Sequence, residues 1–174
     1  EFSDMQAYEP SRSEVNFLHP DSIRDYLFRT RPDLIINAAA HTHGEEPETP
    51  AGYFSAMAVN GQAVGHLARA ARLLGAPLIH YSTDRVFGRN RPGSFREDDI
   101  PGPPGYLSAH ARSKLLGEKM LLSERVGNYL IRTAGLFGSS GGRPSLRKNP
   151  VDAFLGRDDV FVPADANEAR AFTY

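Results

Sequence analysis

The stretch from Leu78 to Gly88 constrains the fold more than any other part of the chain. It begins as a short apolar run and ends abruptly in Ser82, Thr83 and Asp84. Such a run is typical of a buried parallel strand, and open α/β sheets bind ligands where the carboxyl ends of their strands open into a crevice. The stretch therefore predicts hydroxyl and carboxylate groups beside a bound molecule. A strand followed by an ordinary turn fits the same residues, and only the neighbouring segments distinguish the two interpretations.

Segments of strand and helix character alternate along the chain. We expect strands at 34–40, 77–83 and 128–133, and helices at about 21–31, 51–74 and 109–125, the last with Leu115, Leu121 and Leu122 facing inward. A short helix near 149–155 and a strand at 160–162 are expected in the tail. Because the strands are continuous apolar runs, the pattern predicts a doubly wound α/β fold, with a mostly parallel sheet and helices on both faces.

Composition excludes several classes of function. The chain has no cysteine, so it has neither a disulfide framework nor a thiolate metal site. Its net charge of -1 offers no electrostatic footprint for nucleic acid. No apolar stretch approaches the ~18 residues of a membrane span, and no signal peptide is visible. We therefore expect no nucleic-acid or membrane partner and a cytoplasmic location. The chain starts without methionine and stops within a pattern, as a fragment of a longer source does.

Four motifs, in this order, carry a family resemblance. They cover residues 31–42, with Arg31-Pro32-Asp33 and Asn37-Ala38-Ala39-Ala40-His41-Thr42, then 79–84, 111–119 and 131–133. Together they resemble the dTDP-4-dehydrorhamnose reductases, which are extended short-chain dehydrogenase/reductases, over a region from about Val15 to Tyr174. The resemblance implies a partial Rossmann-like dinucleotide-binding domain at residues 1–138 and the start of a substrate-binding region at 139–174.

The same resemblance implies a reaction and its residues. The reaction is NADPH-dependent (or NADH-dependent) reduction of the 4-keto group of dTDP-4-dehydro-L-rhamnose, a nucleotide-linked sugar. The hydroxyl of Thr83 would bond the substrate oxygen, Asp84 would contact substrate, and Lys114 would hold the nicotinamide ribose and tune the acid. Hydride delivery to a carbonyl builds an alkoxide, which needs a donor in place as the charge develops. The implied cofactor contacts are Asn16, Phe17, Ala40, His41, Thr42, Tyr81 and Lys114.

The sequence departs from the family pattern at three places. His110 stands four residues before Lys114, where the family has the acidic tyrosine. Its imidazole is suited to proton donation near neutral pH, although it is shorter than a phenol. Tyr106 lies eight residues before Lys114. On one helix this is ~12 Å of rise, too far for the lysine to tune the phenol, whereas an insertion that shifts the alignment would let Tyr106 swing in. No glycine-rich phosphate-binding turn precedes Val15, and Gly135 replaces a substrate-contacting tryptophan of the family.

These departures leave alternatives open. One is a non-catalytic relative that binds NAD(P) or a regulatory partner and has lost the tyrosine, and another is a nucleotide-sugar epimerase. Thr83 could simply cap a turn, and Lys114 could be a solvated helix residue. His41, His43 and His80 have no compact ligand spacing, so we expect no metal site. A homodimer is compatible with the sequence. Position 110 discriminates best between an active reductase and a binding module.

Overall fold

The computed structural model describes residues 6–41, 49–88, 94–124, 127–136 and 172–173. In chain order the elements are α1 (Pro20–Thr30), β1 (Ile35–Asn37), α2 (Pro50–Ala56), the π-helical segment η1 (Met57–Gln62), α3 (Ala63–Leu74), β2 (Leu78–Thr83), the 3-10 turns η2 (Asp84–Phe87) and η3 (Pro104–Tyr106), α4 (Ala109–Ser123), β3 (Tyr129–Thr133), β4 (Gly135–Leu136) and β5 (Phe172–Thr173).

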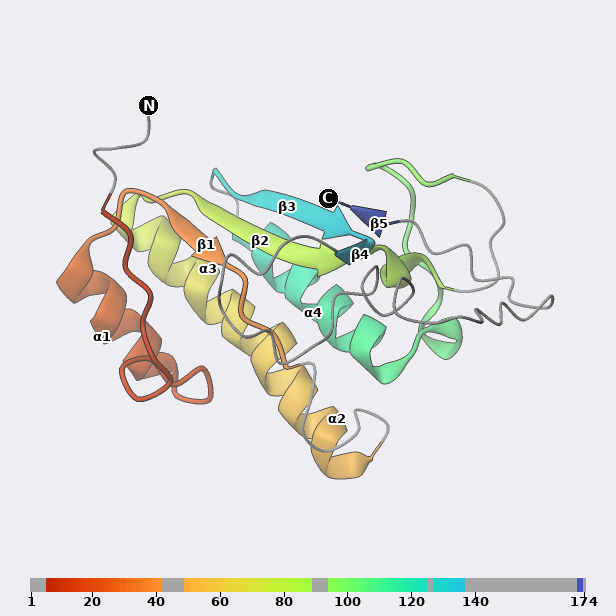
Figure 1. The fold of residues 1–174 in the computed structure, drawn as a ribbon, viewed down its shortest axis with the longest axis horizontal. Helices are drawn as coiled ribbons and strands as arrows, with labels where there is room; N and C mark the ends of the chain where they lie inside the picture. Colours follow the sequence, from red (N-terminus) through yellow and green to blue (C-terminus); the bar gives the residue numbers. More distant parts are fainter. Residues whose placement is uncertain (1–5, 42–48, 89–93, 125–126, 137–171, 174) are drawn as a thin grey trace, which may run out of the picture.

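The central feature is a parallel sheet in the order β1-β2-β3, with β2 in the middle (Figure 1). Ile35 lies opposite Leu78, and Thr83 at the end of β2 lies opposite Thr133 at the end of β3. Parallel strands require crossover connections, which are supplied here by the helices between them. All three carboxyl ends therefore meet at one edge of the sheet, and the α/β class predicted from the sequence is confirmed.

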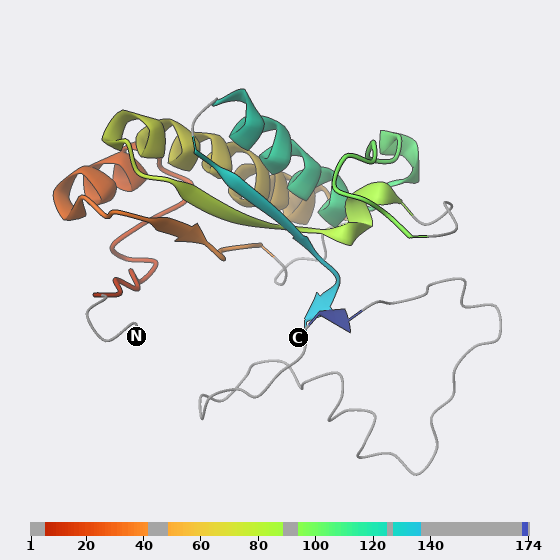
Figure 2. The same ribbon diagram turned by 90° about the horizontal axis from the view of Figure 1, so that it is seen from above.

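The long helices lie on one side of this sheet. Seen edge-on, α1, α3 and α4 all lie above the strands (Figure 2). Ile23 of α1, Leu67 of α3, Leu78 of β2 and Leu121 of α4 belong to one buried apolar cluster. The opposite face of the strands carries Ile36, Tyr129 and Ile131, which are exposed. We expected helices on both faces, and those of the described residues lie on one.

The helix that the sequence predicts from 51 to 74 contains one wide turn. The pattern runs from α2 through η1 into α3 without a break in the backbone, and η1 has π-helical hydrogen bonding. Here the helix lies very close to α4: a Cβ placed on Gly61 would come within 2.5 Å of the Leu116 side chain, and one on Gly117 would overlap the carbonyl oxygen of Asn60. Glycine at these positions permits the close approach of the two helices.

Most predicted elements agree with the structure within a few residues at their ends, and two differences stand out. Leu122 is 61% exposed, so its expected inward orientation is wrong, whereas Leu121 is fully buried. Strand β4 pairs in parallel with β5, a pairing between distant segments that the sequence pattern does not reveal. The expected helix at 149–155 and strand at 160–162 lie outside the described residues.

Candidate functional site

Lys114 reaches from α4 to the carboxyl half of β2. Its side chain is only 6% exposed, and its Nζ donates a hydrogen bond to the carbonyl oxygen of Tyr81 at 2.9 Å. Burial lowers the pKa of the Lys114 ammonium, and the carboxylate of Glu118, one turn further along α4, opposes this effect. The lysine is therefore not the solvated helix residue of the alternative interpretation. Its partner Tyr81 lies two residues before Thr83 on the central strand.

Thr83 is the residue at which β2 turns into η2. Its Oγ1 accepts a hydrogen bond from the Arg85 backbone N–H at 3.3 Å and donates one to Asp84 Oδ1 at 3.2 Å. Thr83 thus caps η2, as the alternative interpretation of this residue as a turn cap predicted. Capping leaves the side chain half-buried at the edge where the parallel strands end. Thr83, Asp84 and Lys114 are therefore brought to the same end of β2.

His110 lies in the first turn of α4, four residues before Lys114. The helix begins at Ala109, and the hydroxyl of Ser108 caps it by accepting from the Ala111 N–H at 3.2 Å. Tyr106 lies before the cap, in η3, and is 62% exposed. Because α4 begins where the sequence predicted, Tyr106 does not share a helix with Lys114. His110 alone occupies the position four residues before the lysine.

The loop after β1 is fixed by Asn60, a residue that sequence reasoning missed. Asn60 Oδ1 accepts from the His41 N–H at 2.7 Å, while its Nδ2 donates to the His41 carbonyl at 3.1 Å and to Ser113 Oγ at 3.0 Å. The buried amide therefore joins the predicted cofactor loop, with Ala40 and His41, to the residue next to Lys114. A polar residue in the middle of an apolar helical pattern was the available signal.

Not every predicted cofactor contact joins this cluster. The described hydrogen bonds of Asn16 run to Leu18, His19 and Ser22, just before and within the first turn of α1, and Phe17 packs on the apolar cluster of α1 and α3. No described contact links either residue to Lys114. Thr42 lies outside the described residues.

His80 occupies the same strand as Tyr81 but points to the helix-covered face. It is fully buried, and its Nδ1 accepts a hydrogen bond from Asn37 Nδ2 at 3.0 Å. Burial, together with the nearby Lys114 charge, lowers the pKa of His80 to about 4. An imidazole held in this way is neutral at physiological pH. It is a core residue, and the alternation of β2 that separates it from Tyr81 is confirmed.

The buried imidazole makes stability depend on pH. The unfolded chain protonates His80 near pH 6.5, whereas the folded chain does so only near pH 4. The free energy of unfolding therefore decreases as the pH falls from about 6.5 towards 4, by about 2 kcal/mol at pH 5. In urea titrations, His80→Gln is expected to remove this part of the pH dependence. The same change at exposed His66 on α3 is the control, and equal slopes in wild type and His80→Gln would contradict the assignment.

A second buried polar cluster joins β2, β3 and α4. Glu118, 1% exposed, accepts hydrogen bonds from Ser82 Oγ at 2.5 Å and from the guanidinium of Arg132 at 3.1 Å and 2.8 Å, one to each carboxylate oxygen. A two-pronged pair of this kind is strong and geometrically specific. It lies on the helix-covered side of the sheet, beside the Lys114 position.

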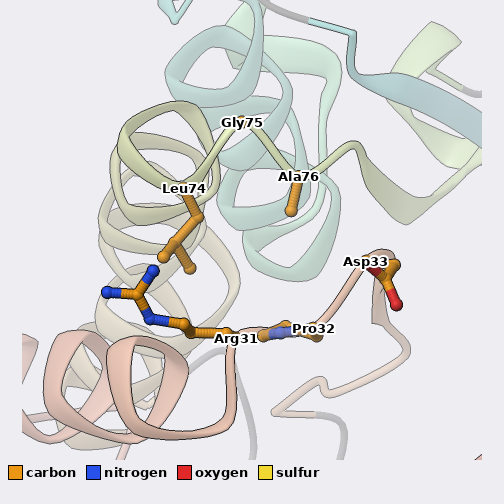
Figure 3. A pocket seen from close by; sticks show the side chains of 6 residues that line it. All are labelled: Arg31, Pro32, Asp33, Leu74, Gly75 and Ala76. Carbon is orange, nitrogen blue, oxygen red and sulfur yellow. The ribbon is translucent and has the colours of Figure 1, made fainter.

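The pocket that Figure 3 shows lies elsewhere. Arg31 reaches towards Leu74 across it, and Asp33 lies on its other side. These residues precede β1 and β2, so the pocket lies at the amino ends of the strands. It is at the opposite end of the sheet from Thr83 and Lys114.

No cluster of three histidine or carboxylate side chains in the described ranges could hold a metal ion. Within the same ranges, no helix has the length and apolar character needed to cross a bilayer.

Known proteins match the chain in sequence and in structure. The family described as the RmlD substrate binding domain matches residues 1–166. The dTDP-4-dehydrorhamnose reductase of Shigella flexneri is 34% identical over 126 residues, which are 72% of this chain and 40% of that protein. The enzyme of Streptomyces griseus is 34% identical over 163 residues, which are 93% of this chain and 51% of that protein.

Solved structures give the same result. The dTDP-4-dehydrorhamnose reductase of Bacillus anthracis, in complex with NADP, has a TM-score of 0.72 at 26% identity, covering 85% of this chain and 49% of that one. The Clostridium acetobutylicum protein has a TM-score of 0.75 at 25% identity, covering 88% and 50%. The chain spans about half the length of these relatives. Because the family match covers nearly all its residues, the chain belongs to the RmlD substrate binding domain family, and the resemblance to dTDP-4-dehydrorhamnose reductases is confirmed.

Proposed function

We propose that the chain is part of an NADPH-dependent reductase that converts the 4-keto group of dTDP-4-dehydro-L-rhamnose, giving dTDP-L-rhamnose. The observation that carries the proposal is the buried ammonium of Lys114 on the Tyr81 carbonyl, beside the Thr83 end of the central strand. The relatives named for this reaction support it. The chain spans about half of their length, so the proposal concerns the whole protein.

The described residues fit the nicotinamide-ribose end of a dinucleotide. Lys114 supplies a buried cation, and the imidazole Nε2 of His41 is buried without a hydrogen-bond partner among the described residues. Both belong to segments that Asn60 joins at the carboxyl edge of the sheet. Lys114, Tyr81, Ala40 and His41 would hold this end of NADPH, or of NADH. The nicotinamide supplies the hydride.

The chain's own residues then have separable tasks. The hydroxyl of Thr83 would donate to the carbonyl oxygen of the sugar, which becomes more basic as negative charge develops on it. Lys114 would orient the ribose and stabilise that charge. His110 would give the proton, since it lies one helical turn before the lysine. Asp84, next to Thr83 at the start of η2, would contact the sugar.

A second function is favoured by His110 itself. The family pattern has tyrosine at this position, and a shorter imidazole with both Thr83 and Lys114 retained is what a non-catalytic NAD(P)-binding or regulatory relative would carry. Such a relative would bind the dinucleotide without turnover. An epimerase is a further alternative, and no described residue favours it over the reductase.

Replacing His110 by tyrosine tests the two functions. In the full-length protein, His110→Tyr is expected to raise NADPH-dependent reduction of dTDP-4-dehydro-L-rhamnose by more than about tenfold, because a correctly placed acid contributes ~100-fold or more. The rate is followed by NADPH absorbance, and binding by NADPH fluorescence. His66→Tyr on the exposed side of α3 is the matched control.

The outcomes separate the candidates. Slow turnover in the wild type that rises in His110→Tyr supports an impaired reductase. Binding without turnover in both proteins supports the non-catalytic relative. A substantial rate that is the same in both proteins would show that neither histidine nor tyrosine at position 110 acts as the acid.

Three further features belong to this proposal. The division into a dinucleotide-binding part at residues 1–138 and a substrate-binding part from 139 stays a prediction. So do formation of a homodimer and a cytoplasmic location.

A further inference from the structure

The buried pair of Glu118 and Arg132 does more than join two strands to a helix. Glu118 accepts hydrogen bonds from Nε and Nη2 of the Arg132 guanidinium, which leaves Nη1 free to donate to another group. That group is the backbone carbonyl of Glu97, at 3.3 Å. Glu97 belongs to residues 94–102, which we call the strap segment. One arginine therefore connects the core of the site to a surface segment.

The strap segment packs against η2. The ring of Phe95 stacks on Phe87 with centroids 4.3 Å apart and an interplanar angle of 3°, and Arg132 lies over Phe87 at 5.0 Å from the ring centroid. The Gly102 N–H donates to the Val86 carbonyl at 2.9 Å. A Cβ on Gly102 would come within 2.6 Å of the Phe87 carbonyl oxygen, so only glycine permits this approach.

Phe87 thus contacts both the Phe95 ring and the Arg132 guanidinium. Phe87 is the last residue of η2, and the first residue of η2 is Asp84. A guanidinium that lies over a ring and donates hydrogen bonds to both oxygens of a carboxylate has a fixed orientation. An ammonium cannot make the same set of contacts. The orientation of Arg132, set by Glu118, is thereby passed on to η2 and the strap segment.

We propose that Arg132 is a positioning residue, which holds η2 and the strap segment as one unit against the carboxyl ends of β2 and β3. In this way it sets the position of Asp84 and of the Thr83 cap. The contact of Asp84 with substrate rests on the proposed function. The positioning itself does not, and it can be measured without any ligand.

A purely stabilising role is the alternative. A buried carboxylate without its partner destabilises the whole chain, and removing both charges together often restores stability. The two roles therefore separate in a variant that lacks both charges. Such a variant regains overall stability but still lacks the Arg132 contacts with Glu97 and Phe87.

The test compares Arg132→Met, Arg132→Lys and the double variant Glu118→Gln/Arg132→Met in the full chain. Backbone amide exchange is followed by NMR at Arg85, Gly88 and Gly102, whose N–H groups bond Thr83 Oγ1, the Arg85 carbonyl and the Val86 carbonyl. The Arg31 and Ala76 amides, at the other end of the sheet, report on global opening. Arg72→Met, which removes an exposed pair with Glu124, is the matched control.

We expect exchange at the three site amides to rise about tenfold or more relative to the two reference amides in every Arg132 variant, the double variant included. The double variant is expected to recover the melting temperature lost in Arg132→Met, and Arg132→Lys is not expected to restore protection. The proposal is overturned if site and reference amides change together in all variants, or if the double variant regains protection at η2. Absence of NADPH binding in the wild type would refute the proposed function alone.

Discussion

Replacing Lys114 by methionine is expected to lower kcat/KM for NADPH-dependent keto-sugar reduction on the order of 100-fold in the full-length protein. Methionine keeps most of the apolar stem but removes the ammonium that lies 2.9 Å from the Tyr81 carbonyl. Under the proposed function, what is lost is the positive charge where the ribose would be held and where the alkoxide would develop. The rate is measured from NADPH absorbance at saturating and limiting sugar, so that kcat and KM are separated.

Lys119→Met is the matched control, because Lys119 lies on the same helix and is exposed. It is expected to keep the wild-type rate. Equal rates in Lys114→Met and wild type would remove Lys114 from the reaction. They would leave its hydrogen bond to β2 as a structural feature only.

The second large effect is on stability. Gly117→Ala is expected to lower the free energy of unfolding by about 3 kcal/mol, because overpacking at a rigid contact cannot be relieved by a rotamer change. The added methyl group would overlap the carbonyl oxygen of Asn60 and press on Val64 at 3.2 Å. Urea denaturation followed by far-ultraviolet circular dichroism measures the loss.

Gly105→Ala provides the comparison, since a Cβ at Gly105 meets nothing within 4 Å. Its stability is expected to stay near that of the wild type. If Gly117→Ala were equally harmless, α4 and η1 would have to separate more easily than their close packing indicates. An altered exchange rate at the His41 amide, which Asn60 binds, would report the same displacement at the site.

Local patterns were enough to predict the strands and helices that bring the site together. The run into Ser82, Thr83 and Asp84 indicated the carboxyl end of β2, and the spacing of His110 and Lys114 indicated one face of α4. Both follow from the periods of strand and helix, which depend on neighbouring residues alone. The burial of Lys114 needed the packed structure, because it depends on atoms of β2, which is distant in the sequence.

Three features were not predicted from the sequence. Asn60 is a polar residue within an apolar helical pattern, but the π-helical hydrogen bonding of η1, in which it lies, leaves no distinct period in the residues. The pair of Glu118 and Arg132 joins two motifs of the family resemblance, but spacing along the chain does not show that they meet. Leu121 and Leu122 are neighbours on α4, and Leu121 faces the apolar cluster of α1 and α3 whereas Leu122 is exposed.

The wide turn of η1 has a consequence for chain length. One residue of an α-helix corresponds to about 100° of rotation. The loss or gain of a single amino acid there would swing the Asn60 amide away from the backbone of His41, even if every residue type were kept. The number of residues between the loop end and Ala63 is thus as much a part of the site as the identity of any side chain in it.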